Sequence, residues 1–506
     1  MRLVFFAGYI RNRRQLCREL ALTDGETEQA VLEAAYSRWG ERLADHLYGG
    51  FAFVFENPES GTLFCVRDQF GLQPFFYMVT GKGELLYGSD INGLVRDPRC
   101  RRSVDPEAIQ YYMCFGYPAG EKTIWKGIRK LMPGQTLTFR GGKARVSTYY
   151  KKTWTPESEC TEEEWTGRIG ETLARIIRED RENVDFRSAC SFLSGGVDSS
   201  YLLAVSGVSR AVGIGYRGEN ASETFLAAQT AKALGADFSE ADVTPEMFFD
   251  AIPQMVRRTG LPLADASAAV FGIGCEMAAR KASVCYSGEG ADEFFAGYRI
   301  YLHADKLAQT GGPWHYGCAG VMNAENAARL LMLEHPFSLV HLVKELYEES
   351  EGDEHLSRLL RIDCALWLEG DILFAAGCSA KAAGLRLLLP YADRRMFELA
   401  ARIPSALKQK DGIEKYILRR AAEKCLPAET AFRRKVGFSV PVRKWLRTEP
   451  FRGRAESVLF GDRSVRFFDQ PLLRQYWSSF QAGNDEAWQI PYAAYVFIIW
   501  AMEYGV

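Results

Sequence analysis

The sequence predicts an α/β protein of two domains. The first is rich in β-strands, and the second is a doubly wound parallel sheet with a helical C-terminal part. Short β-branched and aromatic runs fill the first 150 residues, apolar strands alternate with helical stretches from about residue 164, and the chain after residue 320 has an almost wholly helical pattern. A length of 506 residues is enough for two or more domains.

The N-terminal domain is expected to span residues 1–152. Four strands separated by Gly, Asn, Asp and Pro are predicted at residues 3–10, 51–56, 62–67 and 75–79. One amphipathic helix fits residues 27–39 and ends at Gly40, and residues 136–150 predict a closing hairpin across Gly141 and Gly142. The domain is therefore predicted to be mainly β-structure with one clear helix.

The second domain is expected to span residues 164–506, after a polar and acidic linker that contains one proline. Its strand candidates are residues 192–194, 211–216 and 282–287, each followed by a helical stretch. In a parallel sheet of this kind, ligands bind at the carboxyl ends of the strands. The turns that follow these strands are therefore the first places to look for a site.

A Gly-rich turn follows the first of these strands. Ser194, Gly195 and Gly196 turn the backbone, and Val197 opens a helix that continues through Asp198, Ser199 and Ser200. Backbone amides at a helix N-terminus attract an anion, and glycine allows a phosphate to approach closely. The turn is not a Walker loop, because the required lysine is missing. A Gly-rich turn of an ordinary α/β domain is the alternative, and Asp198 with the two following serines favours the anion site.

This turn resembles the pyrophosphate loop of the ATP pyrophosphatases, and the whole chain resembles a narrower family. It is similar to asparagine synthetase and its relatives, the β-lactam synthetases and lasso-peptide cyclases. Motifs in the order of that family lie at residues 50–57, 66–77, 123–134, 194–200, 261–267, 286–298, 389–395, 412–420 and 433–441. The resemblance implies an N-terminal domain like the Ntn hydrolases, of the class II glutamine amidotransferase type, and a C-terminal domain of the ATP-pyrophosphatase type.

The resemblance also implies how ATP and Mg²⁺ are bound. The nucleotide would contact two Gly-rich turns, formed by Ser194, Gly195, Gly196, Asp198, Ser199 and Ser200 and by Gly288, Glu289 and Gly290. Asp198 and Asp292 supply the hard oxygen ligands that Mg²⁺ prefers. By resemblance Lys415 contacts phosphate, and Lys435 stabilises the charge that develops when the acyl-adenylate is attacked. Either lysine alone would be read as a surface charge, and only the motif around it favours a catalytic role.

The N-terminal domain departs from the glutamine-dependent members of the family. Those members begin with Met-Cys, whereas residue 2 is Arg here and the first cysteine is Cys17. By the resemblance, Ala7 and Tyr9 replace the Asn and Glu that hold glutamine, and we expect the first strands of the glutaminase domain to be absent. A truncated domain without its nucleophile predicts no glutaminase activity. We expect a structural relic or a docking surface for a partner protein.

A second departure lies in the synthetase domain. Arg386 stands in place of a family Glu that serves as base toward ammonia, and Leu388 replaces an Arg. A guanidinium keeps its proton and cannot accept one from an amine. Arg386 is therefore a catalytic candidate that could bind a carboxylate of a different substrate, unless a local alignment shift hides the base elsewhere.

The favoured function is an ATP-dependent ligase that adenylates a small-molecule or peptide carboxylate for attack by an amine, with an intramolecular cyclase preferred. Ammonia-dependent asparagine synthesis and non-catalytic binding are the alternatives, and a tRNA thiolase is disfavoured by the absence of paired cysteines. A net charge of −2 gives no electrostatic case for a nucleic-acid or membrane partner. Twelve scattered cysteines without a C-x-x-C pair predict reduced thiols and a cytoplasmic enzyme.

Overall fold

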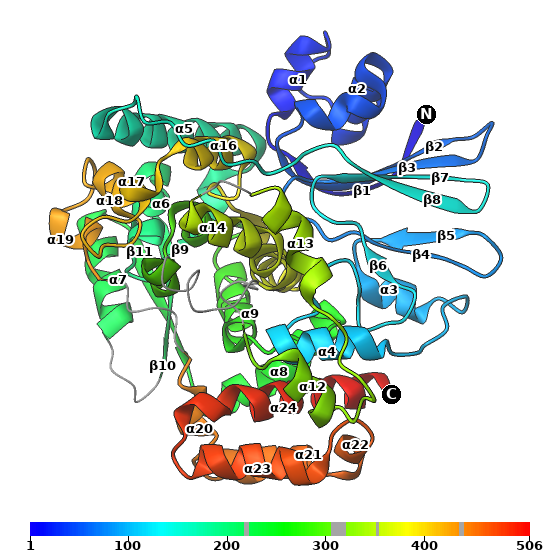
Figure 1. The fold of residues 1–506 in the computed structure, drawn as a ribbon. Helices are drawn as coiled ribbons and strands as arrows, with labels where there is room; N and C mark the ends of the chain where they lie inside the picture. Colours follow the sequence, from blue (N-terminus) through cyan, green and yellow to red (C-terminus); the bar gives the residue numbers. More distant parts are fainter. Residues whose placement is uncertain (217–221, 305–319, 351–353, 435–439) are drawn as a thin grey trace.

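The N-terminal domain is built on two antiparallel sheets (Figure 1). The computed structural model describes residues 1–216, 222–304, 320–350, 354–434 and 440–506. The larger sheet has the order β1 (Arg2–Ile10), β2 (Gly49–Asn57), β3 (Thr62–Arg67), β7 (Gln135–Arg140) and β8 (Lys143–Thr148). The smaller sheet has the order β5 (Leu85–Gly88), β4 (Phe76–Val79) and β6 (Arg129–Lys130). The four predicted strands and the final hairpin are all present, within one or two residues of the expected bounds.

Strand β2 shows why the domain is layered. Alternate side chains of a strand point to opposite faces of the sheet. Phe51, Phe53 and Phe55 pack in a core with α1 (Arg13–Glu19) and α2 (Glu28–Trp39), whereas Ala52 and Val54 pack in a core shared with the smaller sheet. Helix α2 begins as predicted, because the Thr27 hydroxyl accepts a 3.2 Å hydrogen bond from the amide of Ala30. Strand β2 of the larger sheet is thus buried on both faces, whereas β8 at its edge is exposed.

The C-terminal domain contains a parallel sheet, as the sequence predicts, and the sheet has five strands where three were expected. Its order is β11 (Asp237–Val243), β10 (Arg210–Tyr216), β9 (Ala189–Phe192), β12 (Val284–Tyr286) and β13 (Arg386–Leu388). Strands β11 and β13 were not predicted. The first carries charged residues along an edge, and the second is only three residues long, so neither has the apolar run that marks a buried strand.

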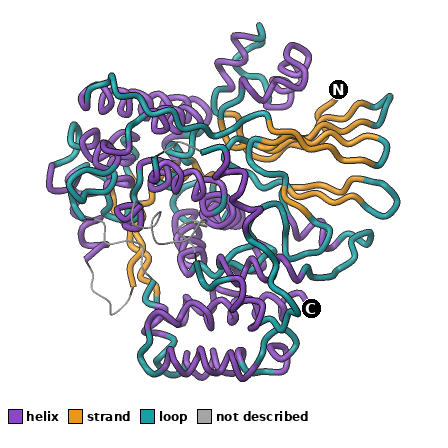
Figure 2. The backbone as a smooth tube through the Cα atoms, in the orientation of Figure 1, coloured by secondary structure: helices purple, strands orange, loops and turns teal. Residues whose placement is uncertain are grey.

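Helices cover both faces of this sheet, which is the doubly wound arrangement (Figure 2). Cys190, Phe192 and Cys285 lie in a core with residues of α9 (Ala266–Ala279) and α15 (Phe374–Ala382). Ala189 and Val284 lie in another core with α5 (Glu162–Asn183) and α6 (Val197–Ser206). Neighbouring residues of the same strands therefore face opposite layers of helices.

The remaining helices complete the two domains. In the N-terminal domain they are η1 (Gly40–His46), α3 (Ile91–Arg96) and α4 (Pro106–Phe115). Around the parallel sheet they are η2 (Phe186–Ser188), α7 (Ser222–Ala233), α8 (Pro245–Thr259), α10 (Ala291–Phe295) and η3 (Arg299–His303). Later in the chain lie α12 (Ala324–Leu330), α13 (Val340–Glu348), α14 (His355–Ala365), η4 (Leu368–Leu373), α16 (Arg394–Arg402), α17 (Ser405–Lys408), α18 (Tyr416–Ala422) and α19 (Ala428–Ala431). The last are α20 (Val442–Trp445), α21 (Phe451–Leu459), α22 (Asp462–Val465), α23 (Gln470–Gln481), η5 (Asp485–Trp488) and α24 (Gln489–Tyr504).

Buried charges join the two domains. The Arg11 side chain, which is fully buried, donates hydrogen bonds of 2.7 Å to Asp180 on α5 and of 2.6 Å to Asp393 before α16. The connecting segment is itself fixed, because the amide of Thr155 donates to the carbonyl of Ala401 at 3.1 Å. No helix in the part of the chain that the structure describes is long and apolar enough to cross a membrane.

Candidate active site

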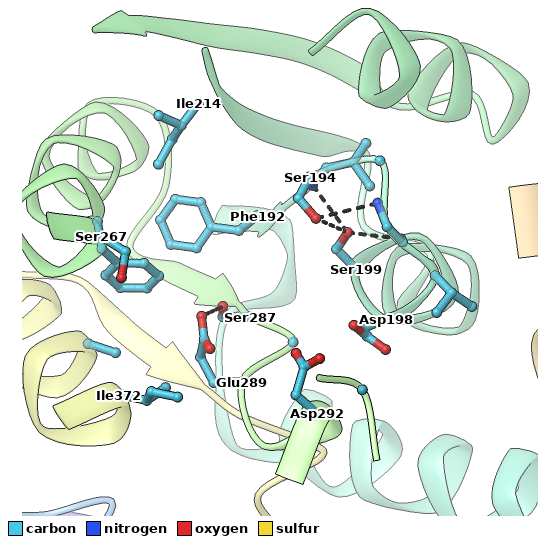
Figure 3. Close-up of a pocket in the computed structure, with 18 of the residues that line it drawn as sticks. Phe192, Ser194, Asp198, Ser199, Ile214, Ser267, Ser287, Glu289, Asp292 and Ile372 are labelled. Atoms are coloured by element: carbon cyan, nitrogen blue, oxygen red, sulfur yellow. Dashed lines mark hydrogen bonds between the residues drawn. The ribbon is translucent and has the colours of Figure 1, made fainter. Parts of the chain in front are cut away.

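A cavity of about 430 Å³ opens at the carboxyl ends of β9, β10 and β12 (Figure 3). This is the edge of the sheet where a doubly wound fold binds its ligands. Of the residues predicted to bind the nucleotide or the metal, eight line this cavity: Ser194, Gly195, Gly196, Asp198, Ser199, Gly288, Glu289 and Asp292. The buried Lys415 also lines it. Residues that are far apart in the sequence thus share one site.

The first Gly-rich turn is held in shape by its own serines. The Ser199 hydroxyl accepts a 3.1 Å hydrogen bond from the amide of Ser194 and donates a 3.2 Å bond to the carbonyl of Gly196. Gly196 is the N-cap of α6, a helix of ten residues, so the amides of the first turn of α6 face the loop. The turn therefore has the geometry of an anion site.

Lys415 is the central charge of the cavity. Its ammonium lies 2.9 Å from Asp292 Oδ1 and also contacts Asp198 Oδ2, so it bridges the two carboxylates. The side chain is about 1% exposed and passes close to Gly297. A Cβ atom added at Gly297 would lie 1.9 Å from Lys415 Cε and 2.1 Å from Asp292 Oδ1. The glycine leaves the space through which the ammonium reaches both acids.

Asp198 and Asp292 also fit a Mg²⁺ ion. They come from separate turns, at the start of α6 and on α10, and they are brought together at the ammonium of Lys415. Asp198 Oδ1 is buried without a hydrogen-bond partner among the described residues, which leaves one hard oxygen available. Mg²⁺ is commonly held by one or two carboxylates together with substrate phosphates and water. Among the described residues there is no cluster of three or more potential metal ligands, so phosphate oxygens would have to complete such a site.

Three arginines add positive charge around the first turn. Arg419, Arg433 and Arg434 line the cavity, and Arg433 donates a 3.1 Å hydrogen bond to the carbonyl of Gly195. Guanidiniums suit a triphosphate, because they are always charged and can pair with phosphate oxygens. The Nε and Nη1 of Arg419 already donate to the carbonyls of Glu414 and Ala431, so Arg419 contributes mainly its charge. They lie in the motifs at residues 412–420 and 433–441, where only the lysines were singled out. Lys435 lies outside the described residues.

The rest of the cavity wall is largely apolar. Phe192, Val212, Ile214, Leu226 and Phe271 lie on the side of β9 and β10, and Trp367, Ile372, Ala375 and Ala376 lie on the side of η4 and α15. The site therefore combines a charged centre with apolar flanks, as small-molecule sites commonly do. These apolar residues could not be assigned to a site from their sequence pattern, which is also that of an ordinary core.

A buried acid, Glu293, follows Asp292 directly in the chain and lies near the charged centre of the cavity. The hydroxyl of Tyr298 donates a 2.5 Å hydrogen bond to Glu293 Oε1, and the indole of Trp367 donates a 3.3 Å bond to the Tyr298 hydroxyl. Burial, and next the charge of Asp292, raise the pKa of Glu293 to about 8. Tyr298 and Trp367 both line the cavity, so this acid is linked to it through two side chains.

Comparisons with known proteins agree with the geometry. The sequence model of the asparagine synthase family matches residues 173–502, and that of the glutamine amidotransferase domain matches residues 1–150. The chain belongs to the asparagine synthase family. It is therefore an ATP-dependent carbon–nitrogen ligase of the type that forms AMP and pyrophosphate, with an Ntn-like domain and an ATP-pyrophosphatase-like domain.

Named relatives of this asparagine synthase-family chain cover most of its length. It is 31% identical to the glutamine-hydrolysing asparagine synthetase 1 of Bacillus subtilis, over 88% of this chain and 77% of that protein. It is 28% identical to a putative glutamine-hydrolysing asparagine synthetase of Mycobacterium bovis, over 98% of this chain and 83% of that protein. The NMN synthetase structure from Francisella tularensis, at 11% identity and a TM-score of 0.23, covers 42% of this chain and 94% of its own. That likeness is too low to carry an argument.

Three residues predicted for the site of this ligase do not line the cavity. Ser200 is a fully buried residue of α6, and Gly290 caps α10 in a left-handed conformation. Arg386 lies at the first residue of β13, opposite Val284 at the start of β12, whereas the cavity is at the other end of these parallel strands. Its guanidinium donates a 3.3 Å hydrogen bond to the carbonyl of Asn183 and lies 5.5 Å from the ring centroid of Tyr9. The expected catalytic contact of Arg386 is thus replaced by an interdomain one.

Proposed function

We propose that the protein uses Mg²⁺ and ATP to adenylate a substrate carboxylate and then passes the acyl group to an amine. The observation that carries this proposal is the buried ammonium of Lys415 between Asp198 and Asp292, where two Gly-rich turns meet. A non-catalytic binding protein would have no physical need to bury this ammonium between two partly exposed carboxylates, because desolvation of the charge is costly.

The reaction would proceed in two steps, adenylation of the carboxylate and transfer of the acyl group. A carboxylate oxygen of the substrate attacks the α-phosphorus of ATP, the bond to the β-phosphate oxygen breaks, and pyrophosphate leaves. An amine nitrogen then attacks the acyl carbon and loses a proton, and the bond to AMP breaks. A bound Mg²⁺ would neutralise the phosphate charge. Lys415 and the guanidiniums of Arg419 and Arg433 lie where they could stabilise the negative charge on the leaving pyrophosphate.

We further propose that the amine does not come from glutamine held in the N-terminal domain. Tyr9 stands where the family resemblance expects a glutamine-binding Glu. It is only 6% exposed, and it accepts a 3.1 Å hydrogen bond from Arg11. The guanidiniums of Arg11 and Arg386 each lie 5.5 Å from its ring centroid. A ring packed in this way supports an intramolecular amine, as in β-lactam synthetases and lasso-peptide cyclases, over a glutamine-derived one.

The cysteines bear on the cellular compartment in which the protein acts. The described cysteines are free, and most of them are buried. Reduced thiols of this kind suit a reducing compartment, and we propose the cytoplasm.

The deciding experiment compares substrates at fixed Mg²⁺ and ATP. Pyrophosphate, AMP and the mass of the product are measured with aspartate plus glutamine, with aspartate plus ammonia, and with larger acids that carry their own amine. The D198N variant serves as the inactive background. We expect pyrophosphate and a dehydrated cyclic product with an amine-bearing acid. Asparagine formed from aspartate and glutamine would overturn the substrate proposal, and asparagine formed with ammonia would support the ammonia-dependent alternative.

A further inference from the structure

One wall of the cavity is formed by a π-helical turn. Helix η4 (Leu368–Leu373) adjoins α15, and Ile372 lies in it. Trp367, just before η4, lines the cavity with Ile372 and with Ala375 and Ala376 of α15. A π-helical turn lacks the regular hydrogen bonds of an α-helix and is often found at functional sites. Its i→i+5 hydrogen bonds give a rarer geometry, which contacts from outside the helix can stabilise.

Glu369 of this turn is bound by two cations from the N-terminal domain. Arg67 Nη1 lies 2.9 Å from Glu369 Oε1, and Lys130 Nζ lies 2.9 Å from Glu369 Oε2. The three side chains are at most 6% exposed. Despite burial, Lys130 and Arg67 hold the pKa of Glu369 below its usual range. The carboxylate is thus held charged at both oxygens.

Arg67 is itself fixed in the N-terminal domain. Its Nε donates a 2.7 Å hydrogen bond to the carbonyl of Gln73, and its Nη1 donates a 2.7 Å bond to the carbonyl of Leu131. A guanidinium is planar and presents its donors in a fixed fork, so these bonds define the direction from which it reaches Glu369. The position of the π-helical turn is therefore set by the backbone of the other domain.

Aromatic contacts support the same turn. A Cβ atom added at Gly370 would lie 2.6 Å from the ring of Tyr117, so this ring packs directly on the backbone of η4. The rings of Tyr117 and Trp367 are edge to face with centroids 6.0 Å apart, as are the rings of Phe76 and Phe374. The N-terminal domain thus contacts the wall before, within and after the π-helical turn.

We propose that Arg67 and Lys130, acting through Glu369, are positioning residues for the wall against which the non-nucleotide substrate packs. The substrate part of this inference rests on the proposed function. The wall that they position is formed by Trp367, Ile372, Ala375 and Ala376, so the substrate presents an apolar group to it. The N-terminal domain then helps to shape the synthetase site, whether or not it catalyses a reaction of its own.

The test compares Glu369→Gln with a matched control, Asp180→Asn. Both substitutions remove one buried carboxylate that pairs with an arginine of the N-terminal domain, but Asp180 lies on α5, which contributes no residue to the cavity wall, whereas Glu369 lies in η4, which contributes Ile372. We expect Glu369→Gln to raise the KM of the carboxylate substrate roughly tenfold or more and to change the KM of ATP less than about twofold. Asp180→Asn should change neither constant.

Hydrogen–deuterium exchange gives a measurement that needs no substrate. Amides of residues 366–376 should exchange faster in Glu369→Gln than in the unmodified protein, and Asp180→Asn should leave them unchanged. If no acid yields pyrophosphate, the proposed function fails and the exchange result still decides the positioning role. If Glu369→Gln does not fold, Gly370→Ala perturbs the same turn without removing a charge. Equal effects of the two carboxylate variants, or no effect of Glu369→Gln, would overturn the inference.

Discussion

A single added methyl group at Gly297 should disable the site while leaving the fold intact. The Cβ atom of Gly297→Ala would lie 1.9 Å from Lys415 Cε, where carbon atoms in contact are separated by about 3.5 Å. The side chain of Lys415 must therefore move by about 1.5 Å, although it is buried and bonded to Asp292 at 2.9 Å. A misplacement of about 1 Å can cost roughly a hundredfold in rate, and we expect a loss of at least that size.

The assay is pyrophosphate release with the best carboxylate substrate, together with a thermal unfolding curve. Gly167→Ala is the control, because a Cβ atom at Gly167 on α5 meets nothing within 4 Å. The control should keep full activity, and Gly297→Ala should unfold at nearly the same temperature as the unmodified protein. Undiminished pyrophosphate release by Gly297→Ala would refute the role given to the bridging ammonium.

The remaining predictions concern other charged groups of the site and its surroundings. Asp198→Asn or Asp292→Asn should each reduce pyrophosphate release roughly a thousandfold in a folded protein, because the proposed Mg²⁺ site would lose a charged ligand; activity within tenfold of normal would contradict this. Arg386→Ala should leave the rate nearly unchanged, since its guanidinium binds the carbonyl of Asn183 at 3.3 Å and not the cavity, and a large fall in kcat would show otherwise. Because the pKa of Glu293 is raised to about 8, the folded state binds a proton that the unfolded state has lost above about pH 4.5, so stability falls as the pH rises toward 8. Glu293→Gln should therefore gain stability, relative to the unmodified protein, between pH 6 and pH 8 in urea titrations, and an equal difference at both values would exclude this titration.

The sequence motifs identify the residues of the charged centre. They do not identify residues whose position depends on contacts between segments that are distant in the sequence. Asp198 and Asp292 each follow a Gly-rich turn after a strand, and β9 and β12 are neighbours, so the two acids had to come together. Arg386 shows the limit of the motif alignment. Its place depends on the direction of β13, a strand of three residues that has no apolar pattern of its own. The partners of Glu369 lie 302 and 239 residues away, in another domain, and no local pattern reveals them.

The apolar flanks could not be assigned for a different reason. Phe192 and Phe271 have the same alternating or helical spacing as core residues, and part of the cavity wall is indeed continuous with the core. Whether such a side chain faces a cavity or another side chain depends on packing that periodicity does not encode. The helical end of the chain was predictable because apolar residues repeat there at helical spacing, as in α23, which buries Leu473, Trp477 and Phe480.

The buried ion pairs between the domains limit how easily the first domain can be altered or lost during evolution. Loss of Arg11 or Arg67 from the first domain would leave Asp180 or Glu369 short of a cation in the interior, whereas Asp393 would keep Arg395 of its own domain. Each unpaired buried charge costs about 3–5 kcal/mol, which is comparable with the whole stability of many proteins. Deletion of the whole first domain would instead expose the apolar rings of Phe294 and Phe397, which pack on Phe70. A lineage that ceases to need the chemistry of its first domain would therefore still carry that domain, and selection would act on it through the folding of its neighbour.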